Sequence, residues 1–306
     1  MGLKGKKVTV FGGSGFIGSH VADFLTENGY DVTIFDIKPS PYLKPNQKML
    51  VGDVLDFEMV EKGVENASIV YNFAGIADID EAREDPIGTI KRNILGNGYI
   101  LESIKESNIQ RYVFASTVYV YSNSGSFYRD SKTACELYIS DYHDKYDIPY
   151  AILRYGSIYG PRTNQKDRIY LLTKQALTEK KMTYEGSGEE IREYIHVEDA
   201  ARCSVEILDG LYANQTIIIT GQHPINLKNL MTVINEILGK KVEIEFLNKG
   251  SETHYEITPY SFSPRLGRKY FSNHYIDLGQ GIIQCMEEIY SSLKEENFKL
   301  ALTWDE

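Results

Sequence analysis

Short apolar runs alternate with amphipathic stretches along the first half of the chain. Six of these runs have the length and composition of buried strands: KVTVFG, DVTIFD, KMLVGD, ASIVYNFAG, RYVFAS and YAILRYGSIYG. The stretch GFIGSHVADFLTENG, which ends at Gly29, has the pattern of a helix, and helical or loop segments follow the later runs. Since apolar strands separated by helices are typical of parallel sheets with right-handed crossovers, the pattern predicts a doubly wound α/β sheet of the Rossmann type.

The pattern becomes less regular beyond residue 162. Short apolar runs such as QTIIIT and KVEIEF are mixed there with four stretches of helical periodicity: 167–179, 197–209, 226–238 and 278–296. This mixture predicts a smaller C-terminal α/β lobe that holds the substrate. We expect a Rossmann domain over residues 1–165, to which segments near 190–220 return, and a lobe formed mainly by residues 166–306.

The composition argues against several classes of function. Of the 306 residues, 42% are hydrophobic and 25% are charged, as is usual for a globular protein. The formal net charge is −10 and there is no long basic run, which argues against nucleic acid as the main partner. The scattered histidines and the three cysteines form no metal or disulfide pattern, and no apolar stretch has the length of a membrane span. We expect a cytoplasmic protein without metal, membrane or nucleic acid partners.

A glycine-rich segment, VTVFGGSGFIGSH, follows the first predicted strand and opens the first helix. Its Gly12, Gly15 and Gly18 allow a tight turn and let a pyrophosphate approach the backbone and the helix N-terminus. Asp36 ends the second strand, where a carboxylate accepts hydrogen bonds from ribose hydroxyls and repels a 2′-phosphate. The three features together predict NAD rather than NADP as cofactor, although Lys38 is a nearby cation that could tolerate a phosphate.

The segment FASTVYVYSNSGSFYRDSK holds the candidate catalytic groups. Ser116 and Thr117 come at the carboxyl end of a strand, where open α/β sheets bind their ligands. Tyr128 and Lys132 are four residues apart and share one face of the next helix. A lysine ammonium and a positive nicotinamide would lower the tyrosine pKa from about 10, so that the phenolate takes a proton from a sugar hydroxyl. The simpler alternative is that Tyr128 is an aromatic residue at the start of the helix and only packs on the sheet.

Eight segments together resemble the extended short-chain dehydrogenases/reductases, and within them the NAD-dependent nucleotide-sugar epimerase/dehydratase family. The segments are VFGGSGFIGSH, GDV, NFAGIAD, RNILGNGYILES, ASTVYVYS, YRDSKTACE, LRYGSIYGPR and REYIHVEDAAR. They extend over nearly the whole chain. The resemblance implies an NAD-dependent enzyme that acts on a nucleotide-diphosphate sugar.

The resemblance also implies roles for individual residues. The catalytic residues would be Thr117, Tyr128 and Lys132. The cofactor would be bound by Gly12, Gly15, Phe16, Ile17, Gly18, Asp36, Ile37, Asp53, Val54, Phe73, Ala74, Gly75, Asn93, Ser116, Tyr128, Lys132 and Tyr155. The substrate would be bound by Thr117, Ser157, Arg192 and Arg265, with Arg192 on the diphosphate and Arg265 as one candidate, beside Arg268, for a second diphosphate arginine.

The chain departs from the family pattern at positions that bear on the reaction. The 4,6-dehydratases carry an acidic pair after the threonine, and the decarboxylases carry a glutamate at the second of these places. Val118 and Tyr119 stand there instead, which argues against both reactions and leaves 4-epimerisation. Ser157 replaces an asparagine that contacts the substrate, and Ala77 replaces the lysine of galactose-type epimerases.

The loop between Thr117 and Tyr128 is short, since the two residues are 11 positions apart. Most of the family has a longer loop that helps to close over the sugar, so we expect a more open sugar site here. The catalytic geometry survives such trimming because both groups stand on regular elements and the loop only joins them.

Three functions remain open from the sequence. The first is a nucleotide-sugar 4-epimerase that oxidises carbon 4 transiently, and the second is a 4-dehydrogenase or 4-ketoreductase that releases or consumes the 4-keto sugar. The third, of another class, is a non-catalytic NAD-binding sensor or scaffold. Amphipathic helices over 84–108 and 128–147 would build a homodimer interface as in the family, so a homodimer is expected.

Overall fold

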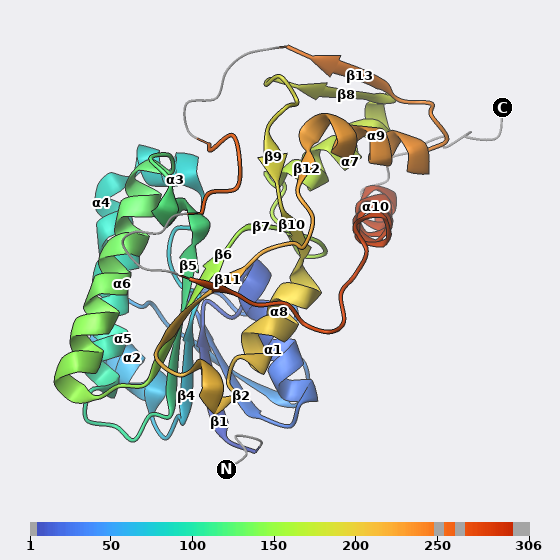
Figure 1. Ribbon diagram of the computed structural model, residues 1–306. Helices are drawn as coiled ribbons and strands as arrows, with labels where there is room; N and C mark the ends of the chain where they lie inside the picture. Colours follow the sequence, from blue (N-terminus) through green and yellow to red (C-terminus); the bar gives the residue numbers. More distant parts are fainter. Residues whose placement is uncertain (1–4, 248–253, 261–266, 296–306) are drawn as a thin grey trace.

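The computed structural model describes residues 5–247, 254–260 and 267–295. Its centre is an eight-stranded sheet with the order β14-β11-β6-β5-β4-β1-β2-β3, in which every neighbouring pair is parallel (Figure 1). The strands are β1 (Lys7–Phe11), β2 (Asp31–Asp36), β3 (Gln47–Val51), β4 (Ile69–Asn72), β5 (Arg111–Thr117), β6 (Tyr150–Tyr155), β11 (Gln215–Ile219) and β14 (Arg268–Lys269). The order reverses between β1 and β4, and the predicted doubly wound α/β class is confirmed.

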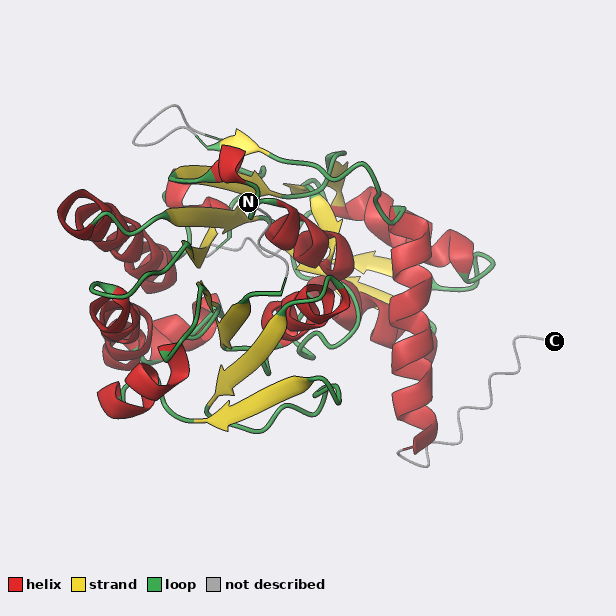
Figure 2. Ribbon diagram, turned by 90° about the horizontal axis from the view of Figure 1, so that it is seen from below, coloured by secondary structure: helices red, strands yellow, loops and turns green. Residues whose placement is uncertain are grey.

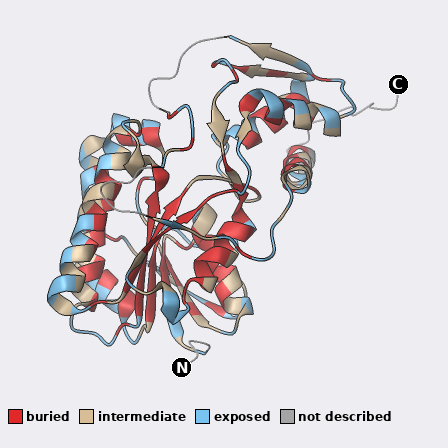
Figure 3. Ribbon diagram, in the orientation of Figure 1, coloured by how far each residue is buried: buried red, intermediate tan, exposed pale blue. Residues whose placement is uncertain are grey.

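Helices cover both faces of this sheet (Figure 1). One face packs against α1 (Phe16–Glu27) and α8 (Val197–Glu206), and the other against α2 (Phe57–Val64), α5 (Gly96–Ile104) and α6 (Ser126–Tyr146). The strands of the sheet are largely buried between these two layers (Figure 3). Strands buried on both faces must be apolar throughout, which explains the continuous apolar runs in the sequence.

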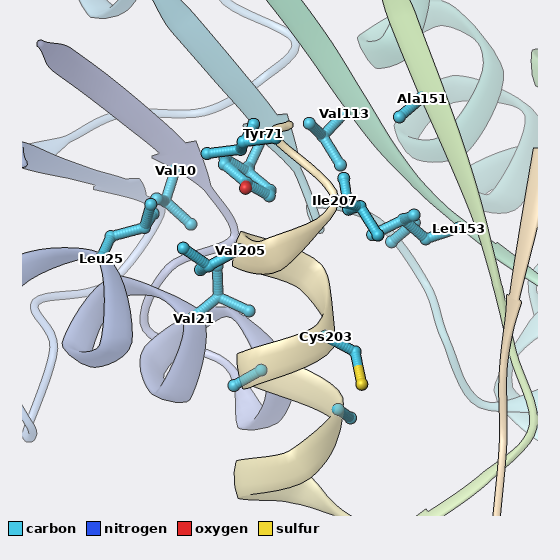
Figure 4. Close-up of a cluster of buried hydrophobic side chains, with 14 of the residues drawn as sticks. Val10, Val21, Leu25, Tyr71, Val113, Ala151, Leu153, Cys203, Val205 and Ile207 are labelled. Atoms are coloured by element: carbon cyan, nitrogen blue, oxygen red, sulfur yellow. The ribbon is translucent and has the colours of Figure 1, made fainter. Parts of the chain in front are cut away.

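The apolar core between the sheet and helices α1 and α8 shows how these two helices pack on the sheet. Val21 and Leu25 of α1 and Val205 of α8 lie close to Val10 and Tyr71 of the sheet (Figure 4). All five side chains are at most 7% exposed, and the Tyr71 hydroxyl donates to the backbone oxygen of Ser204 at 2.8 Å. A segment late in the sequence therefore completes the layer that the first helix begins.

A smaller region follows the carboxyl ends of the strands and has its own apolar core. It contains α7 (Arg168–Glu179), α9 (Leu227–Ile237) and α10 (Leu278–Glu295), and Figure 2 shows α10 as one long helix at the side of the molecule. Three strand pairs accompany these helices: β7 (Ser157–Tyr159) with β10 (Tyr194–His196), β9 (Ile191–Arg192) with β12 (Ile225–Asn226), and β8 (Lys181–Tyr184) with β13 (Glu243–Phe246).

Two predicted elements differ from the structure. The run YAILRYGSIYG was expected to be one strand, but it divides at Gly156 into β6 and β7, which belong to different sheets. A Cβ at Gly156 would lie 2.4 Å from Oγ1 of Thr220, so the chain can turn there only because no side chain is present. The expected helix 84–108 consists of α4 (Pro86–Thr89), a π-helical turn η1 (Ile90–Leu95) and α5.

Two classes of feature are absent from the described part of the chain. No helix there is both long and apolar enough to cross a bilayer. Nor do three or more histidine, cysteine, aspartate or glutamate side chains gather there in a way that could hold a metal ion.

Candidate active site

The glycine loop after β1 packs too closely for side chains. Gly12 has φ +73°, and a Cβ there would lie 2.6 Å from the backbone nitrogen of Ala74. A Cβ at Gly18 would lie 2.2 Å from the backbone oxygen of Gly12. At Gly15, the N-cap of α1, no side chain caps the helix, so the first backbone N–H groups stay available to an anion. The loop therefore fits the pyrophosphate of a dinucleotide.

Asp36 is fixed at the end of β2, beside this loop. Its Oδ2 accepts from the backbone nitrogen of Ser14 at 3.0 Å, and its Oδ1 accepts from that of Lys38 at 3.3 Å. Each carboxylate oxygen keeps a further lone pair, so the group can still accept hydrogen bonds from a ribose. The Lys38 side chain itself is exposed.

One cavity of about 1140 Å³ extends from the glycine loop to the second region. Fourteen of the predicted site residues line it: Gly12, Gly15, Phe16, Ile17, Gly18, Phe73, Gly75, Ser116, Thr117, Tyr128, Lys132, Tyr155, Ser157 and Arg192. Predicted residues that do not line it are Asp36, Ile37, Asp53, Val54, Ala74 and Asn93. Arg265 lies outside the described residues.

The three predicted catalytic residues all line this cavity. Thr117 is the last residue of β5, Tyr128 lies in the first turn of α6, and Lys132 follows one turn later. The Lys132 Nζ donates to the backbone oxygen of Ala115 at 2.8 Å and lies 5.9 Å from the centre of the Tyr128 ring. The parallel sheet thus brings the end of one strand next to the start of the following helix.

Burial has the largest influence on the pKa values of Tyr128 and Lys132. It raises the pKa of Tyr128 to about 12, although a side-chain hydrogen bond with Thr117 acts in the opposite direction. Burial also lowers the pKa of Lys132 to about 8. The sequence led us to expect a lowered tyrosine pKa, whereas in the protein alone it is raised. The low-dielectric surroundings disfavour the phenolate, and the Lys132 ammonium donates to a backbone carbonyl.

An ion pair lies directly beneath Ser116. The Ser116 hydroxyl donates to Glu136 Oε1 at 2.5 Å, and Arg154 binds the same carboxylate through Nε at 2.9 Å and Nη2 at 2.5 Å. The Arg154 side chain is 1% exposed and that of Glu136 is 6% exposed. This network joins α6 to β5 and β6, and it holds the helix that carries Tyr128 against the sheet.

Asn93 lies behind the cavity wall. Its Oδ1 accepts from the backbone nitrogen of Ile76 at 2.7 Å, while its Nδ2 donates to the Ile76 oxygen at 3.0 Å and to Ser131 Oγ at 2.9 Å. Gly75 has φ +131°, and a Cβ there would lie 2.4 Å from Asn93 Oδ1. Asn93 therefore holds the turn at Gly75, which lines the cavity, to helix α6.

The remaining residues predicted to contact the cofactor differ in burial and in their place relative to the cavity. The ring of Tyr155 lines the cavity, but its hydroxyl is hydrogen-bonded to Ser204 Oγ at 2.6 Å. Of the residues expected near the adenosine, Val54 is buried, whereas Ile37 is 63% exposed and Asp53 is also exposed. Ile37 and Asp53 therefore lie at the surface, outside the cavity lining.

Arg192 of β9 lies across the cavity from the sheet. Its Nη1 donates to the backbone oxygens of Ile191 at 2.9 Å and Glu256 at 3.0 Å, and its guanidinium lies 4.2 Å from the centre of the Tyr255 ring. Ser157 Oγ is 3.4 Å from the Tyr255 hydroxyl. The predicted substrate residues are thus joined through a tyrosine that the sequence analysis did not single out.

His254 and Tyr255 were missed because they are far from the motifs in sequence. The Tyr119 hydroxyl is 2.7 Å from His254 Nδ1, across a separation of 135 residues, and the rings of Tyr119 and Tyr255 are 4.5 Å apart. Both residues line the cavity beside Tyr128. This late segment therefore lies over the short loop that was expected to leave the sugar site open.

Known proteins share both the sequence and the fold. A model described as the NAD dependent epimerase/dehydratase family matches residues 8–219. A provisionally named UDP-glucose 4-epimerase of Methanocaldococcus jannaschii is 30% identical over 257 residues, which are 77% of this chain and 84% of the relative. A dTDP-D-glucose 4,6-dehydratase of Dictyostelium discoideum is 29% identical over 231 residues, 63% of this chain and 53% of the relative.

Among solved structures, the fold is similar to that of UDP-glucuronic acid 4-epimerase from Bacillus cereus in complex with UDP-glucuronic acid and NAD. The TM-score is 0.81 at 24% identity, and the match covers 94% of this chain and 99% of the other. The glycine loop, the cavity and the sequence matches therefore agree on one conclusion. The chain belongs to the NAD-dependent epimerase/dehydratase family, whose enzymes act on nucleotide sugars.

Proposed function

We propose that this protein is an NAD-dependent nucleotide-sugar 4-epimerase. The observation that carries the proposal is the surroundings of Thr117. Tyr128 and Lys132 share the cavity with it, whereas the two following positions hold Val118 and Tyr119 rather than carboxylates. A single tyrosine is enough to remove and return one proton, but elimination of water also needs an acid for the leaving hydroxyl.

Candidate binding groups for both ligands support the proposal. The backbone N–H groups at the start of α1 would hold the cofactor pyrophosphate, and Asp36 would accept from its adenosine ribose. Arg192 would hold the substrate diphosphate from the opposite side of the cavity. Bound NAD would supply a reversible hydride acceptor for carbon 4 of the sugar.

Proton transfer would be the task of Tyr128, assisted by Thr117 and Lys132, which line the same cavity. Tyr128 would take the proton of the sugar 4-hydroxyl as the carbon loses its hydride, and Thr117 would hydrogen-bond the same oxygen. Lys132 would orient the cofactor ribose and favour the phenolate electrostatically. After the 4-keto sugar turns over, Tyr128 would return the proton to its oxygen.

The reaction can be tested by following the sugar and the cofactor together. The purified protein is mixed with UDP-, GDP-, dTDP- and CDP-sugars and NAD, while absorbance at 340 nm is recorded and the sugar is analysed by NMR. A 4-epimer that forms with little net absorbance supports the proposal. Absorbance that rises in step with sugar consumption would instead identify a 4-dehydrogenase, and an unchanged sugar with bound NAD would favour a sensor or scaffold.

We also propose that the protein acts as a homodimer. Exposed apolar side chains lie on α4, η1 and α6, the helices expected to form the interface: Ile87, Ile90, Leu95, Leu137 and Tyr138. Their exposed fractions run from 44% to 63%, which is high for large apolar residues on one side of a molecule.

A further inference from the structure

The part of the cavity beyond Arg192 contains a carboxylate that no proposed catalytic step uses. Glu190 lines the cavity together with Arg168, Leu171, Tyr184 and Leu227. Arg168 and Leu171 belong to α7, Tyr184 ends β8, Leu227 begins α9 and Glu190 directly precedes β9, so this end of the cavity is built by the second region. Such a mixture of apolar and aromatic side chains with a few polar groups is typical of a site for a heterocyclic base. Asp167 and Glu189 also line the cavity, but Asp167 caps α7 by accepting from the Tyr170 nitrogen, and Glu189 is exposed.

The position of Glu190 relative to Arg192 suits a nucleotide. β9 pairs with β12 at Ile191 and Arg192, and the pairing continues one step further where the Leu227 nitrogen donates to the Glu190 oxygen at 3.1 Å. In extended backbone, residues two apart point to the same face and are separated by roughly 6.6 Å. A ribose spans a similar distance between a diphosphate and a base.

The Glu190 carboxylate has unused acceptor capacity. Its Oε2 is buried and has no hydrogen-bond partner among the described residues, while the Tyr184 hydroxyl interacts with the same carboxylate. The nearby guanidinium groups face aromatic rings: that of Arg168 lies 5.0 Å from the centre of the Tyr184 ring, and that of Arg192 packs on Tyr255. A buried carboxylate oxygen without a donor is unfavourable, so a ligand that brings N–H groups to this place gains affinity.

We propose that Glu190 selects guanine, and therefore that the substrate is a GDP-sugar; this inference rests on the proposed nucleotide-sugar chemistry. Guanine carries two adjacent donors, N1–H and the 2-amino group, on one edge, which a carboxylate can accept together. Uracil and thymine present one N–H between two carbonyl oxygens, and a carboxylate repels both oxygens. Cytosine and adenine place an amino group beside a ring nitrogen that is itself an acceptor.

Titration calorimetry of the NAD-loaded protein with GDP, UDP, dTDP, CDP and ADP tests the assignment without requiring turnover. GDP is expected to bind at least about tenfold more tightly than each of the others, because the alternative bases leave the buried acceptor unpaired. The Glu190→Gln variant should reduce the preference for GDP over UDP by about tenfold or more, since an amide replaces one acceptor by a donor.

The matched control is Glu185→Gln, which removes the same charge from an exposed side chain of the same loop that does not line the cavity. It should leave the preference unchanged, and NAD binding by both variants checks that they are folded. Tighter binding of any nucleotide other than GDP, or an unchanged preference in Glu190→Gln, would overturn the guanine assignment while nucleotide-sugar chemistry stands. If none of the five nucleotides binds, the proposed function fails as well.

Discussion

Tyr128 would transfer the proton in the proposed reaction. The substitution Tyr128→Phe removes only its hydroxyl. Burial raises its pKa to about 12, so the phenolate must be favoured by the bound ligands and by Lys132. We expect Tyr128→Phe to lower turnover by about 10²–10⁴-fold, the usual contribution of a positioned general base. Steady-state kinetics on the substrate identified by NMR measures the loss.

A matched control tests whether a tyrosine followed by a lysine four residues later matters when it lies outside the cavity. Tyr290 is also followed by a lysine four positions on, but it lies in α10 and does not line the cavity. Tyr290→Phe should keep full turnover. Nucleotide and NAD affinities close to those of the parent protein in Tyr128→Phe would show that only chemistry was lost, and full activity in that variant would exclude the mechanism.

At the level of elements, Asn93 couples the π-helical turn η1 to both the Gly75 turn and α6. Asn93→Ala would leave the buried backbone groups of Ile76 without partners, at a cost of about 1–3 kcal/mol for each group. Because the Gly75 turn lines the cavity, we also expect NAD to bind about tenfold more weakly, a change of about 1.4 kcal/mol. Calorimetry of NAD binding and urea unfolding measure the two effects.

The exposed Asn123 offers a control for that substitution. Asn123→Ala, in the loop between β5 and α6, should change neither quantity measurably. Normal NAD affinity in Asn93→Ala would show that the turn holds its shape without the side chain.

Two buried histidines near the start of α8 link the stability of this element to pH. Burial lowers the pKa of His196, the N-cap of α8, and of His20 on α1 from 6.5 to about 4. Between these values the unfolded chain binds more protons than the folded protein, so stability falls as the pH falls. Each pKa shift changes the free energy of unfolding by about 3 kcal/mol between high and low pH.

Urea midpoints at pH 7 and pH 5 should therefore differ, and the difference should shrink in His196→Gln, which cannot titrate. His223→Gln is the control, because His223 is exposed in the loop before β12. An unchanged pH dependence in His196→Gln would mean that other groups cause the acid sensitivity.

At the scale of the whole molecule, the sequence predicts the central sheet better than it predicts which residues line the proposed sugar site. Strand ends such as Asp36 and Thr117 could be located because their apolar runs are continuous and parallel strands share one edge. The division at Gly156 could not, because it depends on close packing against Thr220, a residue distant in sequence. His254 and Tyr255 were missed for the same reason, since their contacts with Tyr119 join segments with no shared motif.

The helices expected to form a dimer interface also carry exposed apolar side chains. Leu137 is 55% exposed on α6, within the group of apolar side chains that we assign to a homodimer interface. Leu137→Lys would place one charge of each protomer in that interface, where burial without a partner is strongly unfavourable. Light scattering should give twice the chain mass for the parent protein and a monomer for the variant. Leu211→Lys, at a leucine 75% exposed on the turn before β11, should remain dimeric. A parent protein that is monomeric at micromolar concentration would refute the dimer, and a dimeric Leu137→Lys would place the interface on another surface.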